Sequence, residues 1–325
     1  MNTSILGKDF SSEERKISYD YIENFISENV KNWSIAPNTD KLEIAFSKKI
    51  QELDNIDFAF LVCHSGYIPE FYEHDSSQET LYSKLIESLV CEWAKRIGFT
   101  ESILQKQKSN KEDVTIKKGD KVIVCDAKSF RLGRSQAAPN VKDTIKKAAY
   151  VSWLKQYNAD NRIGGLVTFP SLHDWQKGSE AYKYFTEGFP SIMLLFYEQM
   201  SFIMLNGYSA DDLMHFMENY KTVFPNPSEQ KIVYSNGLNN YLLNKDIKRR
   251  NDFMKLYHEI IKEKVSHTLS KIEEHLQQTK TQIIDDIEKM NQEDVKQIAI
   301  DASFHKSCNQ LMKQKENILK FRPYK

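Results

Sequence analysis

Amphipathic helices are predicted near the beginning of the chain. Residues 11–31 start with Ser11 and Glu14 at the spacing of a capping box, and apolar side chains then recur at helical intervals. A second helical pattern covers residues 40–53. A third begins at Ser77, where large apolar residues are spaced four apart along one face: Leu81, Leu85, Leu89, Trp93 and Ile97. Such a face predicts a helix that is buried along one side.

Strand patterns occupy the middle of the chain. Two β-rich runs, at residues 113–116 and 121–127, flank a short turn with a glycine and predict a hairpin. Residues 141–149 return to helical spacing, with alanine, valine and isoleucine on one face and lysines on the other. Apolar runs at 163–169 and 191–197 predict two further strands, the second followed directly by a helix. This order of elements predicts an α/β (α+β) fold with a central mixed sheet flanked by helices.

The flanking stretches divide the chain into three parts. A polar connector is expected at residues 103–111, and the pattern is helical almost throughout from residue 247 onward. We therefore predict a helical N-terminal region at residues 1–75, a central core at residues 76–206, and a mainly helical C-terminal region at residues 207–325.

The composition is that of a globular protein. Of the 325 residues 40% are apolar, and Lys plus Arg (45) balance Asp plus Glu (45), so any basic surface must be local. The most apolar segment, residues 191–205, contains Glu198, and the first thirty residues hold no apolar run, which predicts neither a membrane span nor a signal peptide. Four widely spaced cysteines without a Cys-x-x-Cys pair favour reduced thiols and a cytoplasmic location: Cys63, Cys91, Cys125 and Cys308.

Two acidic residues and one lysine of the predicted hairpin form the main candidate site. Asp113 begins the first strand and Asp126 ends the second, thirteen residues later, so antiparallel pairing brings their carboxylates together. Lys128 follows Asp126 at a spacing of two and therefore points to the same face. Two carboxylates and the backbone carbonyl of Ala127 match the oxygen ligands that Mg²⁺ prefers. With Lys128 orienting or deprotonating a water, or countering phosphate charge, the set suits hydrolysis of a phosphodiester.

Basic side chains are concentrated after this site. Residues 126–150 contain six Lys or Arg and two Asp, a local excess that would attract a nucleic-acid backbone. An ordinary solvated helix face is the alternative for Lys146 and Lys147. The candidate DNA-contacting residues, among which sequence does not sort base from phosphate contacts, are Ser129, Arg131, Arg134, Gln136, Asn140, Lys142 and Lys146.

The residues around the site resemble a known enzyme family. The run D-A-K-S-F-R-L at 126–132, preceded by E-D-V at 112–114, resembles the catalytic strand of HindIII-type restriction endonucleases of the PD-(D/E)xK superfamily. The upstream segments L-V-C-H-S-G-Y-I-P-E (61–70) and S-S-Q-E-T-L-Y-S-K (76–84) are also similar to that family. The likeness covers about half the chain, and the seven-residue run is its most specific part.

The resemblance implies a function and a set of partners. Asp113 and Asp126 would be Mg²⁺ ligands, with Lys128 as the catalytic lysine of a PD-(D/E)xK core. The enzyme would be a type II site-specific deoxyribonuclease, a homodimer that cuts double-stranded DNA at a short palindrome and leaves 5′-phosphate and 3′-hydroxyl ends. It would act beside a cognate DNA methyltransferase in a restriction-modification system, with the C-terminal region supplying dimer or DNA contacts. The stretch at 133–140 departs from the family pattern, so the target sequence stays open.

Weaker candidates and other functions remain. Glu79 begins the helix that would pack on the hairpin, where it either orients a metal-bound water as a further catalytic residue or is a first-turn glutamate favoured by the helix dipole. Glu92 is expected to be a partly buried polar residue rather than a second acidic helper. The alternative functions are a structure-selective or repair DNA nuclease on the same core, or a non-catalytic helical DNA-binding or scaffold protein whose hairpin acids are incidental.

Overall fold

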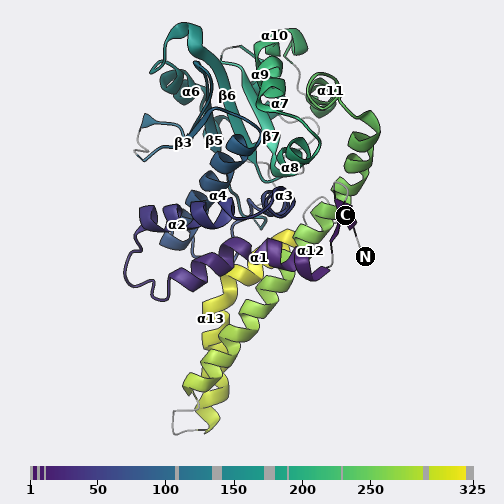
Figure 1. Cartoon of the computed structure of the whole chain (residues 1–325). Coiled ribbons are helices and arrows are strands. Elements are labelled where there is room, and N and C mark those ends of the chain that lie inside the picture. Colours follow the sequence, from purple (N-terminus) through teal and green to yellow (C-terminus); the bar gives the residue numbers. More distant parts are fainter. Residues whose placement is uncertain are drawn as a thin grey trace.

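The centre of the fold is a five-stranded mixed sheet with helices packed around it (Figure 1). The computed structural model describes residues 3–5, 8–10, 12–106, 110–133, 141–171, 180–188, 190–227, 230–287 and 293–319. The strands follow the order β3-β4-β5-β6-β7 across the sheet, with antiparallel pairing from β3 to β5 and parallel pairing from β5 to β7. The strands are β3 (Glu101–Leu104), β4 (Val114–Lys118), β5 (Lys121–Ala127), β6 (Arg162–Phe169) and β7 (Ile192–Phe196). This arrangement confirms the predicted mixed sheet.

The predicted hairpin is formed by β4 and β5. Their register pairs Val114 with Cys125 and Lys118 with Lys121, which leaves a two-residue turn. Gly119 occupies that turn with a φ of +58°, a conformation that glycine adopts without steric cost. Because β5 then pairs in parallel with β6, the chain between them must cross over, and α5 and α6 lie in that crossover.

Helices precede and follow the sheet. The caps are those expected at helix starts: Ser76 accepts a hydrogen bond from the backbone N–H of Glu79 at the start of α4, and Asp54 caps α3 in the same way. The helices are α1 (Ser12–Asn29), α2 (Thr39–Gln51), α3 (Asn55–His64), α4 (Ser77–Arg96), α5 (Val141–Thr144), α6 (Lys147–Leu154), α7 (Glu180–Thr186), α8 (Tyr197–Leu205), α9 (Ala210–Glu218), α10 (Tyr220–Val223), α11 (Lys231–Tyr241), α12 (Ile247–Ile287) and α13 (Glu293–Leu319). A separate two-stranded hairpin is formed by β1 (Thr3–Ile5) and β2 (Lys8–Phe10).

Two local predictions were wrong. The first residues of the expected polar connector, Ile103 and Leu104, belong to β3, a four-residue strand at the edge of the sheet. The strand was not predicted because its isoleucine is exposed rather than buried. The helix predicted at 141–149 is two helices, because Lys146 has extended backbone angles between them. Ile145 and Tyr150 are fully buried whereas Ala148 is exposed. The second helix, α6, therefore packs on the core through Tyr150 rather than through its alanines.

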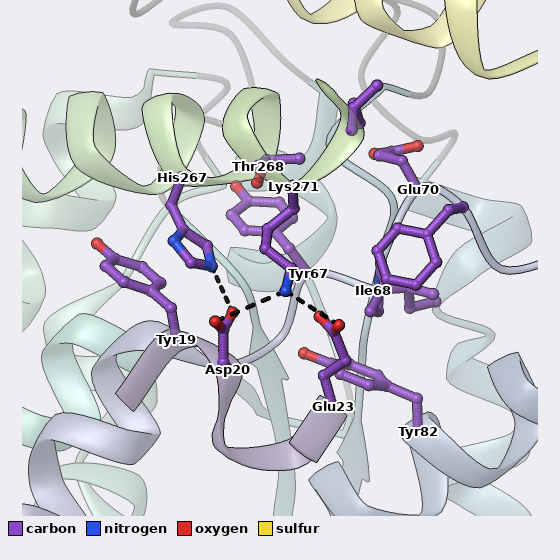
Figure 2. Close-up of a pocket in the computed structure, with 13 residues that line it drawn as sticks. Tyr19, Asp20, Glu23, Tyr67, Ile68, Glu70, Tyr82, His267, Thr268 and Lys271 are labelled. Atoms are coloured by element: carbon purple, nitrogen blue, oxygen red, sulfur yellow. Dashed lines mark hydrogen bonds and ion pairs between the residues drawn. The ribbon is translucent and has the colours of Figure 1, made fainter. Parts of the chain in front are cut away.

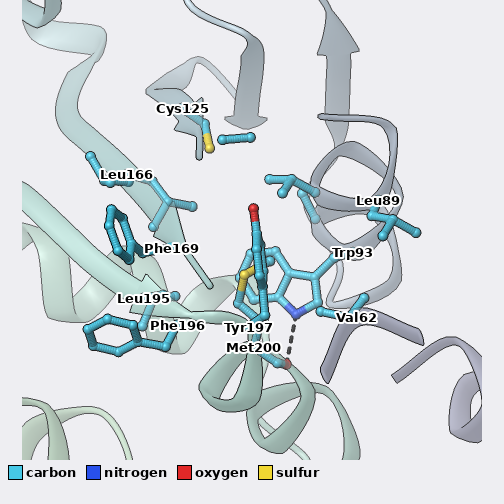
Figure 3. Close-up of a cluster of buried hydrophobic side chains, with 14 of the residues drawn as sticks. Val62, Leu89, Trp93, Cys125, Leu166, Phe169, Leu195, Phe196, Tyr197 and Met200 are labelled. Atoms are coloured by element: carbon cyan, nitrogen blue, oxygen red, sulfur yellow. Dashed lines mark hydrogen bonds between the residues drawn. The ribbon is translucent and has the colours of Figure 1, made fainter. Parts of the chain in front are cut away.

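A large hydrophobic core and a smaller one hold the molecule together. The large cluster takes residues from α1 through the sheet to the first part of α12, so the three predicted regions share it. In Figure 3, Trp93 of α4 lies against α8, where its indole N–H donates to the Met200 carbonyl at 2.9 Å. The smaller cluster joins α12 and α13, which project away from the sheet (Figure 1), and it includes Leu132. No helix in the described part of the chain is long and apolar enough to cross a membrane.

Candidate active site

Asp126 and Lys128 meet at the end of β5. Asp126 is the second-last residue of the strand and is only 6% exposed, because it lies inside the sheet between β4 and β6. The Lys128 ammonium lies 2.7 Å from Asp126 Oδ1 and stays partly exposed to solvent. The period of two along a strand thus places both groups on one face, and the ammonium is the member of the pair that reaches solvent.

Asp113 comes to the same place from the neighbouring strand. It immediately precedes β4, its backbone N–H donates to the Cys125 carbonyl at 3.0 Å, and its Oδ2 accepts the backbone N–H of Ala127 at 3.0 Å. Burial raises the pKa of the Cys125 thiol well above its usual value, and the charges of Asp113 and Asp126 raise it further. Asp113 therefore lies beside the end of β5, bound to the backbone N–H of the residue between Asp126 and Lys128.

Tyr150 of α6 holds the second oxygen of Asp126. Its hydroxyl donates to Asp126 Oδ2 at 3.2 Å, so Lys128 and Tyr150 engage the two carboxylate oxygens from different sides. Burial first, and then the charge of Asp126, raises the pKa of Tyr150 well above its usual value, which keeps the phenol protonated as a donor. The ring fits because residue 165 is glycine: a Cβ there would lie 2.4 Å from a Tyr150 ring carbon.

Tyr197 fixes the backbone at Lys128. The first residue of α8, it donates its hydroxyl to the Lys128 carbonyl at 2.8 Å and accepts a hydrogen bond from Thr168 at 3.2 Å. The Lys128 N–H donates to the Thr168 carbonyl at 3.0 Å, so both polar backbone groups of this lysine are bound. Sequence reasoning missed Tyr150 and Tyr197, since neither belongs to a motif and both reach the site from other elements.

Arg131 and Glu79 bind each other and nearby backbone groups in the structure. The Arg131 side chain is 5% exposed, and its guanidinium donates to the backbone carbonyls of Pro69, Glu70 and Glu73 and to Glu79 Oε2, each at 3.2 Å. Glu79 also accepts the backbone N–H of Asp75 at 2.9 Å. The prediction that Arg131 contacts DNA is therefore corrected, because its donors bind protein acceptors in the interior. The Glu79 carboxylate binds this same arginine and the start of α4, so its contacts are those of the first-turn glutamate that the sequence offered beside a catalytic role.

The other predicted residues are distributed between the site and the surface. Ser129 shares a 2.7 Å hydrogen bond with Ser83 of α4 beside the catalytic strand. Lys142 is exposed and lies 3.4 Å from Glu180, and Lys146 is an exposed residue at the start of α6. Glu92 is partly buried against Arg96 at 2.9 Å, as predicted. Three predicted DNA contacts lie outside the described residues: Arg134, Gln136 and Asn140.

The donor set fits a hard divalent cation. Asp113 and Asp126 offer carboxylate oxygens, the kind of ligand that hard divalent cations prefer, and an ionised carboxylate has about four acceptor sites. No cluster of three or more His, Cys, Asp or Glu suited to a metal exists among the described residues, so further ligands would be backbone carbonyl and water. Mg²⁺ accepts such a set, because it retains several waters and needs few protein carboxylates.

The family follows from a match over most of the chain. The model of the HindIII restriction endonuclease family matches residues 36–315. The chain belongs to this family. A comparison with individually curated proteins found no match. The matched range contains Asp113, Asp126 and Lys128 together with most of α12 and α13, so this HindIII-family member is a nuclease whose substrate is DNA. Family membership and the mixed sheet confirm the predicted fold class and argue against a non-catalytic scaffold.

Proposed function

We propose that the protein is a type II restriction endonuclease that hydrolyses double-stranded DNA at a short palindrome. The reaction depends on Mg²⁺ and leaves 5′-phosphate and 3′-hydroxyl ends. Two contacts at the end of β5 support this proposal in a chain that the HindIII family model matches: Lys128 pairs with Asp126, and Asp113 accepts the N–H of the intervening Ala127. No comparable arrangement of acids and a lysine is needed for DNA binding alone.

Each residue of the site has a defined role in this proposal. Asp113 and Asp126 would hold Mg²⁺ together with the Ala127 carbonyl, and Tyr150 keeps the Asp126 carboxylate in place. When bound, the ion supplies positive charge that stabilises the phosphorane transition state and the leaving 3′ oxygen. The Lys128 ammonium is partly exposed beside Asp126, where it binds the scissile phosphate and orients the attacking water at Nζ. Thr168 and Tyr197 prevent the lysine backbone from shifting.

The DNA-contacting residues are proposed from chemistry and position. Lys142 and Lys146 are exposed cations that follow the catalytic strand in sequence, and they contact phosphates. Ser129 lies next to the catalytic lysine and contacts the backbone at the cut. From the sequence, Arg134, Gln136 and Asn140 remain candidates for base or phosphate contacts.

Cutting both strands of a palindrome requires two catalytic centres. We infer a homodimer in which the C-terminal helices supply dimer or DNA contacts, since α12 and α13 project from the body (Figure 1). A cytoplasmic enzyme of this specificity would cut the host genome unless a cognate DNA methyltransferase protected the same sequence. These assignments follow from the proposed activity and are tested with it.

A plasmid digest tests the proposal. With Mg²⁺, the purified protein is expected to cut a sequenced plasmid at one recurring palindrome, and ends that accept ligation identify the 5′-phosphate. Asp126→Asn and Lys128→Ala should abolish cutting while circular dichroism shows a folded protein. Lys121→Ala is the matched control, because Lys121 lies exposed at the opposite end of the same strand and donates to the Asp160 carbonyl. Cuts without a shared sequence would instead support the structure-selective or repair nuclease.

Metal exchange separates binding from chemistry. Ca²⁺ is a larger and more flexible oxygen-seeking cation, so it should support sequence-specific DNA binding without cleavage. Gel-shift and cleavage assays on one duplex measure both properties. Rapid cutting in Ca²⁺ alone would contradict the role that we assign to the metal.

A further inference from the structure

The segment that leaves the catalytic strand is enclosed by two parts of the molecule. On one side it runs along the loop at residues 66–73: the Phe130 N–H donates to the Gly66 carbonyl at 3.0 Å, and the Ile68 N–H donates to the Phe130 carbonyl at 3.0 Å. On the other side, Leu132 packs into the small cluster formed by α12 and α13. The path from Lys128 to Gly133 is therefore determined by the loop and by the C-terminal helices together.

Glu70 closes the loop side of this enclosure. Its side chain is only 2% exposed, and Oε1 accepts the backbone N–H of Gly133 at 2.6 Å. Its own carbonyl accepts a hydrogen bond from Arg131 at 3.2 Å. Burying a carboxylate costs free energy unless it makes strong hydrogen bonds, and a short bond from a backbone N–H to a charged acceptor is of that kind. An apolar residue at this position would leave the Gly133 N–H unsatisfied.

Helix α13 closes the opposite side. A Cβ at Gly133 would lie 3.1 Å from the Cβ of Gln314 and 3.1 Å from Glu70 Oε2, which is closer than side chains normally pack. Asn317 of the same helix donates to the Gly133 carbonyl at 3.4 Å. Gly133 is thus clamped between Glu70 and α13, and we name these residues the Gly133 clamp: Glu70, Gly133, Gln314 and Asn317.

The helices behind the clamp are anchored to the body of the protein. Figure 2 shows α12 against α1, where Lys271 lies between Asp20 and Glu23 at 3.6 and 3.1 Å and His267 contacts Asp20 at 2.8 Å. Glu70 lines the same small pocket. Because α12 packs on α13 through the small cluster, this anchor holds the far side of the clamp in place.

We propose that Glu70 is a positioning residue of the nuclease. By clamping Gly133 against α13 it fixes the backbone between Lys128 and Gly133, so that the lysine ammonium stays directed at the scissile phosphate. The helices α12 and α13 are then part of the scaffold of the catalytic centre. This inference rests on the proposed nuclease function. It assigns an effect on the cleavage rate to the contact between Glu70 and Gly133, five residues after the catalytic lysine.

Single-turnover cleavage with Mg²⁺ tests the clamp in three variants. Glu70→Ala is expected to lower the cleavage rate about 10- to 100-fold, because small displacements of a catalytic group have effects of this size, and to change KM by less than about threefold. Glu70→Gln keeps an oxygen acceptor for the Gly133 N–H and should stay within about threefold of the wild-type rate. Glu73→Ala is the matched control, since Glu73 is an exposed glutamate of the same loop and should cut at the wild-type rate.

Gly133→Ala probes the same clamp by the opposite change. The added methyl pushes against Glu70 and Gln314, so a rate decrease with unchanged KM is expected from a variant that keeps every polar group. It also decides the question if Glu70→Ala does not fold, as judged by circular dichroism. The inference is overturned if folded Glu70→Ala or Gly133→Ala cuts at the wild-type rate, if only KM changes, or if Glu70→Gln is as slow as Glu70→Ala. A wild-type protein that cuts no DNA would overturn the proposed function itself, a distinguishable result.

Discussion

The end of β5 differs in how it is built from the two exposed lysines that follow it, Lys142 and Lys146, which we call the basic segment. Asp126 is buried, and both of its oxygens are bound by side chains from within the core region, those of Lys128 and Tyr150. In the basic segment, Lys142 and its partner Glu180 have side chains that are 64% and 71% exposed. One region has its geometry determined by packing, whereas the other offers charge on exposed side chains.

This contrast matches the two tasks of a nuclease. Chemistry requires groups that stay within a fraction of an ångström of one geometry, so every neighbour of the catalytic strand restrains it. Attraction of a phosphate backbone requires only that positive charge lies nearby and is free to adapt. Substitutions at the strand should therefore change the rate of cleavage, and substitutions in the basic segment should change affinity and its dependence on salt.

The largest effect is expected at Asp113. Asp113→Asn retains an oxygen that can accept the Ala127 N–H but removes the charge that a cation needs, so cleavage should fall by about 1,000-fold or more. Asp120→Asn, an exposed turn residue of the same hairpin, should leave cleavage unchanged. Plasmid digestion at saturating Mg²⁺ measures both variants. Asp113→Asn with a tenth of wild-type activity would remove this carboxylate from the metal site.

The Arg131→Ala variant distinguishes a role of Arg131 in stability from a role in DNA binding. Arg131→Ala leaves Glu79 and three carbonyls without their buried partner, so the free energy of unfolding should fall by about 3 kcal/mol. Lys146→Ala, at an exposed position, should change it by less than about 0.5 kcal/mol. Urea unfolding followed by circular dichroism gives both values. An Arg131→Ala protein as stable as wild type that bound DNA weakly would instead show that Arg131 contacts DNA.

The Tyr150→Phe variant tests whether fast cleavage requires the hydrogen bond to the second Asp126 oxygen. Tyr150→Phe removes one hydrogen bond and keeps the ring, so we expect about tenfold slower cleavage at saturating DNA. Tyr220→Phe is a matched control, because Tyr220 is also buried but donates to backbone carbonyls of Phe185 and Ile192. Both variants should lose similar stability, and only the first should cut slowly. Equal rates would show that Lys128 alone orients Asp126.

The smallest effects are expected in the basic segment. Lys142→Ala and Lys146→Ala should each reduce the slope of log affinity against log salt by about one unit, with an affinity loss of a few fold and an unchanged cleavage rate. Lys48→Ala on α2, an exposed lysine outside this segment, should leave the slope unchanged. DNA binding in Ca²⁺ at several salt concentrations provides the measurement. A slower cleavage rate at saturating DNA would break the contrast between the two regions.

Local patterns in the sequence determined much of this protein. The spans of α1 and α4, the start of α12 and the β4–β5 hairpin follow from helical spacing, the Ser76 cap of α4 and a turn glycine, all of which act within a few residues. The side-by-side placement of Asp126 and Lys128 follows from the period of two along one strand. Such features need no knowledge of the rest of the chain, which is why they could be predicted.

Only the tertiary structure decided what surrounds these residues. Tyr150 is 24 residues from Asp126, Glu70 is 63 residues from Gly133, and Tyr197 is 69 residues from Lys128, so no local spacing reports their contacts. The same holds for Arg131, whose charge predicted DNA binding but whose burial against the loop at residues 69–73 gave it another role. A side chain's type limits the partners it can bind, and the packing of distant elements selects which of them it meets.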